Sequence, residues 1–134
     1  MKKKVIISIV IILVLAAVGG AIYFLALQDK GDESEPIYTY NIEDAFVTNV
    51  KDSNKLFKTT IVIVADSDQL ADLLSKNQYI VRDTILFLLR DLTEEDIDSD
   101  TIQDTLRVEI TDALNQALNI ENITSVSFGD FVMQ

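Results

Sequence analysis

The sequence contains no cysteine and no histidine, and it has one proline and four glycines among its 134 residues. Without cysteine the chain has no disulfide, no site for lipoprotein acylation and no thiolate for a metal, so it must fold by its hydrophobic core alone. Without histidine it lacks the commonest general base and an imidazole ligand for zinc. The only adjacent glycines, Gly19 and Gly20, lie in an apolar run, so no glycine-rich phosphate loop is present. These absences favour a binding protein without a cofactor over an enzyme.

The second feature is an apolar run without charge at residues 5–27. As a helix it would rise about 35 Å, enough to cross a hydrocarbon core of about 30 Å. Lys2, Lys3 and Lys4 precede the run, and such clusters stay on the cytoplasmic side. We therefore expect a cytoplasmic tip at residues 1–4, a transmembrane helix in the cytoplasmic membrane, and everything after it outside.

A cleaved signal peptide is the alternative interpretation of the same run. Signal peptides have a basic start, an apolar stretch of about 7–15 residues and small residues at the cleavage site. Small residues are present between Ala16 and Ala21, but the apolar run continues to Leu27. This length favours a retained anchor that contacts the lipid bilayer.

The charges are distributed unevenly. All 22 acidic residues follow Leu27, but only 8 of the 11 basic ones do, so this part carries a net charge of −14. Such a surface repels phosphate backbones and anionic lipid headgroups, so nucleic acid is not expected as a partner. Charge alone is equally compatible with simple solubility and with a specific basic partner.

Residues 28–36 are polar and predict a linker to one domain at residues 37–134. Two strands are expected first, at residues 37–50 and 56–65, paired as an antiparallel hairpin. The second strand is apolar on both faces at residues 61–64, as in a central strand that is covered on both sides.

Helical periodicity follows at about residues 69–75, 79–91 and 101–118, with Asp100 expected to cap the third helix. Thr93 is a good N-cap for one more turn before that helix. A final strand is expected at residues 123–133, where Gly129 indicates a bulge or a close backbone approach. The order β-β-α-α-α-β predicts an α+β fold, a small antiparallel sheet with helices on one face.

One cluster of carboxylates resembles the start of a calcium-binding loop. Asp96, Asp98 and Asp100 have the spacing of the first three EF-hand ligands. The sixth loop position requires glycine and the twelfth requires glutamate, but Thr101 and Arg107 stand there. Other acids fall on polar helix faces, where solvation explains them, so neither a metal site nor a catalytic carboxylate pair is expected.

The last strand carries the most distinctive pattern of the chain. Six residues fit V-x-x-V-x-F-x-x-F-V-x-Q, with isoleucine in the first place: Ile123, Val126, Phe128, Phe131, Val132 and Gln134. The pattern resembles the closing strand of the FliL family, the flagellar basal body-associated proteins.

Other parts of the chain resemble the same family in the same order. They include the lysine-led span, the acidic linker, Tyr40–Ile42 where the family has an aromatic–Asn–Leu motif, Arg82-Asp83 and Asn115. The chain departs from the family at residues 78–79 and 100–101, where a proline and a glycine are usual.

The resemblance implies a stomatin-like outer domain that oligomerises around the flagellar motor. Proteins of this family associate with the stator units, MotA and MotB, support torque and swarming, and have no known catalytic activity. The expected partners are therefore MotA, MotB, further copies of the chain and ring components of the basal body. The family-signature positions fit core packing equally well and are expected to be structural: Arg82, Asp83, Asn115, Phe128, Phe131 and Gln134.

Two other classes of function stay open on the sequence. One is a membrane-tethered sensor or envelope-assembly factor unrelated to flagella. The other, with less support, is a membrane-anchored hydrolase that relies on carboxylates alone.

Overall fold

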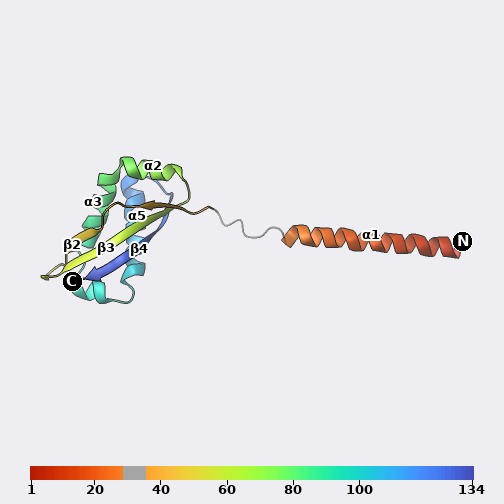
Figure 1. Ribbon diagram of the computed structural model, residues 1–134, viewed down its shortest axis with the longest axis horizontal. Coiled ribbons are helices and arrows are strands. Elements are labelled where there is room, and N and C mark those ends of the chain that lie inside the picture. Colours follow the sequence, from red (N-terminus) through yellow and green to blue (C-terminus); the bar gives the residue numbers. More distant parts are fainter. Residues whose placement is uncertain (29–35) are drawn as a thin grey trace. The chain divides into compact units, whose positions relative to one another are not determined.

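The computed structural model describes residues 1–28 and 36–134 (Figure 1). The chain divides into two units, Met1–Ser34 and Glu35–Gln134. The linker expected at residues 28–36 lies outside the described residues except for its two ends.

The first unit consists of helix α1, Lys2–Gln28, which contains the predicted span. Its 27 residues correspond to a length of about 40 Å. From Val5 to Leu27 its side chains are exposed and, apart from Ser8, apolar around the whole circumference, as is typical of a helix surrounded by lipid. Among the described residues, α1 is the one helix whose length and composition suit a membrane crossing, and a signal sequence would meet the same criteria.

The second unit is built on an antiparallel sheet with strand β3, Leu56–Ala65, at its centre (Figure 1). Strands β1, Tyr38–Asn41, and β2, Phe46–Asn49, pair with the two ends of β3 along one edge. Strand β4, Ile123–Met133, pairs with β3 along the other edge.

The single strand expected at residues 37–50 is thus divided into two. Asn41 pairs with Val62 and Phe46 with Thr59, so the outer chain has two more residues than β3 over the same interval. Asp44 lies in this interval with a φ of 64°, a left-handed conformation that aspartate tolerates better than most residues. Strand β1 therefore ends at Asn41, and β2 begins at Phe46, beyond this aspartate.

Four helices follow β3, where three and a capped turn were expected: α2, Gln69–Lys76; α3, Gln78–Leu89; α4, Glu94–Asp98; and α5, Ile102–Leu118. The turn is α4, whose N-cap Thr93 forms a reciprocal capping box with Asp96. The expected cap of α5 at Asp100 is wrong, because Thr101 is the N-cap and its side chain makes no cap hydrogen bond.

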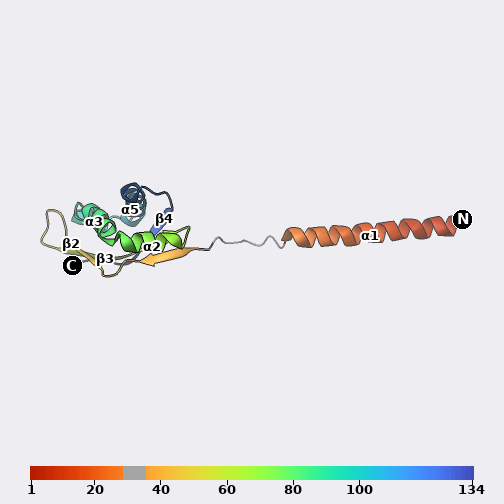
Figure 2. The same cartoon turned by 90° about the horizontal axis from the view of Figure 1, so that it is seen from above.

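The helices cover one face of the sheet, and Figure 2 shows α3 and α5 side by side above it. The α5 stripe buries Ile102, Leu106, Ile110 and Leu114 against the sheet. Alternate residues of β3 point into this core, so the α+β prediction is confirmed. Complete covering of residues 61–64 is not found, because Val62 and Val64 are only half-buried on the opposite face.

The irregularity expected at Gly129 is confirmed. The register between β3 and β4 shifts between Thr59 and Ile61, opposite Gly129. A Cβ at Gly129 would collide with the Oγ1 atom of Thr60. That Oγ1 accepts a hydrogen bond from the Asp130 backbone N–H over 2.9 Å. Glycine at position 129 therefore leaves room for the Thr60 side chain, whose hydrogen bond holds the bulge.

Candidate functional site

The predicted signature residues do not meet in one cleft. Arg82 extends from α3 to the break between β1 and β2, where its Nη1 donates to the carbonyl of Glu43 over 2.8 Å. Its guanidinium also lies 4.5 Å from the centre of the Phe46 ring, within the range of a cation–π contact. Arg82 thereby holds the turn around Asp44, whereas its neighbour Asp83 is exposed.

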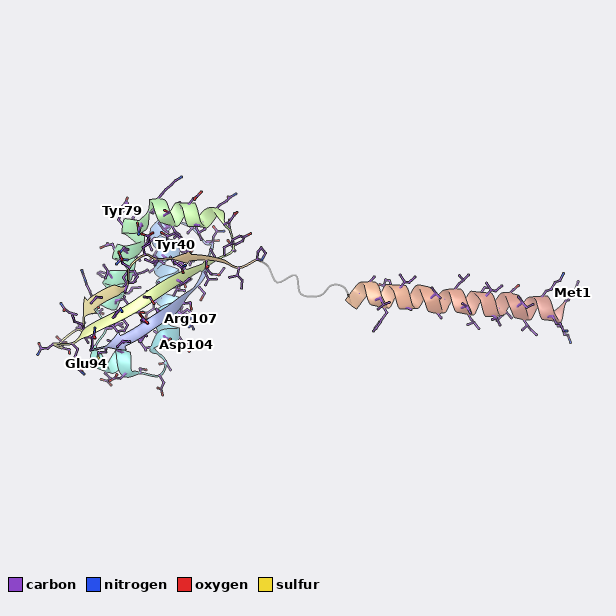
Figure 3. The ribbon with its side chains drawn as sticks, viewed as in Figure 1. Met1, Tyr40, Tyr79, Glu94, Asp104 and Arg107 are labelled. Atoms are coloured by element: carbon purple, nitrogen blue, oxygen red, sulfur yellow. The ribbon has the colours of Figure 1, made fainter. Side chains whose placement is uncertain are left out.

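Asn115 holds the start of β4 in the manner of a neighbouring strand. Its Nδ2 donates to the carbonyl of Ile123 over 2.9 Å, and its Oδ1 accepts from the Ile123 N–H over 3.1 Å. Arg107 lies earlier on the same helix, α5. It donates through Nε to the carbonyl of Val126 and through Nη1 to Asp104 (Figure 3). These contacts occupy the outer edge of the first half of β4, which would otherwise leave polar backbone groups unpaired.

The remaining signature residues lie in the second half of β4. Phe131 makes edge-to-face contacts with Phe57 and Phe128, with ring centroids 4.7 and 5.6 Å away. Both β4 phenylalanines are half-buried. The backbone of Gln134 exchanges hydrogen bonds with Leu56, and its side chain is exposed.

A polar network joins the β2–β3 turn to the start of α4, at the opposite end of α3 from Tyr79 (Figure 3). Glu94 accepts from Lys55 Nζ over 2.7 Å and from the Ser53 hydroxyl. These hydrogen bonds, that of Lys55 first, lower the pKa of Glu94. The same contact raises the pKa of Lys55. All these groups are solvent-accessible, so the network joins the turn to α4 but stabilises the domain only slightly.

The face of the sheet opposite the helices is nearly neutral. Its strand residues carry one cation, Lys58, and one anion, Asp130, which lie 3.5 Å apart as an ion pair. Residues 37–134 contain 18 acidic and 7 basic residues, so this neutrality contrasts with the rest of the domain. We call this surface the open face; its other strand residues are Thr39, Asn41, Val47, Asn49, Leu56, Thr60, Val62, Val64, Ser125, Ser127 and Val132.

The helix layer carries a groove of about 650 Å³ between the end of α3, α4 and α5. Leu88, Leu92 and Ile102 supply its apolar lining, and Phe87 stands beside them with 77% of its surface exposed. The charged lining residues are Arg90, Asp91, Asp96 and Glu109.

The described residues contain no group of three or more carboxylates placed to hold a metal ion. Asp96, first of the three spaced aspartates, bonds through its carboxylate to the backbone and hydroxyl of Thr93. Sequence reasoning missed the bond from Arg107 to β4, because an arginine beside an apolar stripe looks like a solvated residue. It also missed the groove, since exposed Phe87 fits no helical periodicity.

The geometry therefore defines a class: a small acidic α+β domain, preceded by one apolar helix, with a nearly neutral sheet face and an apolar groove in its helix layer. A family model described as "Flagellar basal body-associated protein FliL" matches residues 39–134, nearly the whole of this domain. The "Flagellar protein FliL" of Bacillus subtilis (strain 168) is 30% identical over 125 residues, which cover 88% of each chain. The chain belongs to the FliL family of flagellar basal body-associated proteins.

Proposed function

We propose that this chain supports the stator units of the flagellar motor from the basal body, with MotA and MotB as its partners. The single observation that carries the proposal is the family match over residues 39–134. Ring components of the basal body are further partners in this proposal. The protein works by contact and not by catalysis, in keeping with a sequence that has neither histidine nor cysteine.

In this proposal α1 is a retained single-pass anchor. Residues 5–27 cross the cytoplasmic membrane, and Lys2, Lys3 and Lys4 hold residues 1–4 inside. The domain at residues 37–134 then works outside, within reach of the membrane through the linker at residues 28–36. The length of α1 supports this arrangement over cleavage.

The proposal includes self-association through the open face. Two acidic domains repel each other, and the repulsion is weakest where both present neutral surface. Residues 61–64 are also apolar on both sides of β3, yet the described helices cover only one side. A second copy would cover Val62 and Val64, and shared anchoring in one membrane would raise the local concentration of domains.

Deletion of the gene, with motility scored in soft agar and in viscous medium, tests the motor role. We expect intact filaments but reduced swimming, most of all under load. The full-length protein should restore motility, and so should a chain in which an unrelated transmembrane helix replaces residues 5–27.

A chain in which a cleavable signal peptide replaces residues 1–27 exports the same domain without an anchor. We expect it to fail in restoring motility, because tethering and local concentration are lost. Normal motility under load after deletion would contradict the motor role and favour a tethered sensor or assembly factor.

A further inference from the structure

Phe87 is a largely exposed aromatic residue at an apolar groove. The side chain is 77% exposed in the last turn of α3, next to Leu88 and Leu92. Single exposed apolar residues are common, but an exposed aromatic at the rim of a concave apolar surface is the pattern of a binding hot spot.

The shape of the groove indicates a chain segment as its ligand. Small-molecule sites enclose most of the ligand surface. This groove is open along two helices, since its lining comes from α3 on one side and from Ile102, Thr105 and Glu109 of α5 on the other. An apolar groove between helices suits an extended or helical segment that places one or two apolar side chains in it.

The charges around the groove determine the chemistry of that segment. Asp91, Asp96 and Glu109 supply three negative charges against one positive charge from Arg90. Lys51 pairs with Asp91, and Thr93 bonds to Asp96, whereas the carboxylate of Glu109 makes no hydrogen bond or ion pair with the described residues. A basic segment would gain charge complementarity at Glu109, and Arg90 would disfavour positive charge at its own end of the groove.

We infer that this groove binds a basic segment of another protein, with an apolar side chain placed beside Phe87. A second copy of this chain is a poor occupant, because residues 37–134 carry 18 acidic residues and 7 basic ones. The inference deepens the proposed function by stating the chemistry of a partner, and it concerns a surface separate from the open face.

Photocrosslinking in living cells tests the inference on the full-length protein. A benzoylphenylalanine placed at Thr105, an exposed groove residue, reports what lies in the groove, and mass spectrometry of the adduct identifies the crosslinked peptide. We expect a peptide of another protein that combines lysine or arginine with an apolar residue.

Matched substitutions make the test specific. Phe87→Ala and Glu109→Lys should each weaken the adduct about tenfold or more, because each removes a central contact. Tyr79→Ala removes an aromatic that is 73% exposed at the other end of α3, and Asp112→Lys makes the same charge change one turn further along α5. These two controls should change the adduct less than about twofold.

The same peptide, made synthetically, should bind the purified full-length protein. Its affinity should fall more in the Phe87→Ala and Glu109→Lys variants than in the two controls, and it should fall at high ionic strength. No adduct, an adduct with a second copy or with an acidic segment, or equal losses in all four variants would each overturn the inference. The deletion phenotype does not depend on Thr105, so the groove can fail while the motor role stands.

Discussion

The two faces of the sheet are built from similar residues but have different surroundings. On β3, Ile61 and Ile63 point into the core and are buried, whereas their neighbours Val62 and Val64 point to the open face and are half-buried. The covered face is stabilised by packing against helices of the same chain. The open face keeps β-branched side chains and a near absence of charge without a covering element among the described residues. The comparison shows that β-branched residues identify a strand in the sequence. Which faces of that strand are buried depends on the helices of the chain, or on a partner, that pack against it.

The largest effect expected from this comparison is on the covered face. Ile110→Ala removes a fully buried side chain of α5 and should lower the free energy of unfolding by about 2–5 kcal/mol. Val47→Ala, on the open face where 53% of the side chain is exposed, should cost well under half as much. Chemical denaturation of both variants measures the difference, and equal losses would contradict the assignment of the core to one face.

A smaller effect is expected where a helix side chain holds β4. Asn115→Ala leaves the N–H and carbonyl of buried Ile123 without their partners and should cost about 1–3 kcal/mol. Gln116→Ala, at the exposed neighbouring position of α5, should cost less than about 0.5 kcal/mol. Hydrogen exchange at Ile123 should become faster in the first variant only, and unchanged protection there would show that Asn115 does not hold the strand.

The sequence predicted most of the fold because its signals were local. The α5 stripe, the cap at Thr93 and the glycine of β4 each follow from residues near one another in the chain. The division of the first strand depended on Asp44, whose left-handed conformation is permitted but not required by its residue type.

The candidate sites were less predictable, because they depend on contacts between distant residues. Arg82 reaches a carbonyl 39 positions away, and Arg107 meets β4 across 19 positions. The groove is lined by side chains from three helices, and no spacing of residues in the sequence predicts such a surface. The neutrality of the open face became visible only with the register of β3 and β4, which places Lys58 beside Asp130.

Charge added to the open face should affect association and leave folding nearly unchanged. Val47→Glu and Val132→Glu both place a carboxylate opposite Lys58, so together they should change the stability by less than about 1 kcal/mol. Between copies the added charges repel, and self-association of the full-length protein in detergent, measured by sedimentation, should be lost. Val108→Glu, at a valine 61% exposed on α5, is the control and should leave self-association unchanged. Loss in this control as well would show that net charge acts and that the open face is not the interface.

The smallest effect expected is the pH dependence of the polar network that joins the β2–β3 turn to α4. Hydrogen bonds from Lys55 and Ser53 lower the pKa of Glu94 below its ordinary 4.5. The stabilisation is therefore present above the pKa of the unfolded chain and is lost as the pH falls through the lower folded value. Glu94→Gln should lose less stability than the parent between neutral pH and about pH 3, and the difference should be small because the carboxylate is solvent-accessible.

Glu95→Gln removes a neighbouring exposed charge and should keep the acid sensitivity of the parent. Some sensitivity should persist in both variants, because the Thr93 backbone N–H also lowers the pKa of Asp96. Identical acid profiles for both variants and the parent would mean that Glu94 does not couple the turn to α4, leaving the capping box as the contact that orients this end of the helix layer.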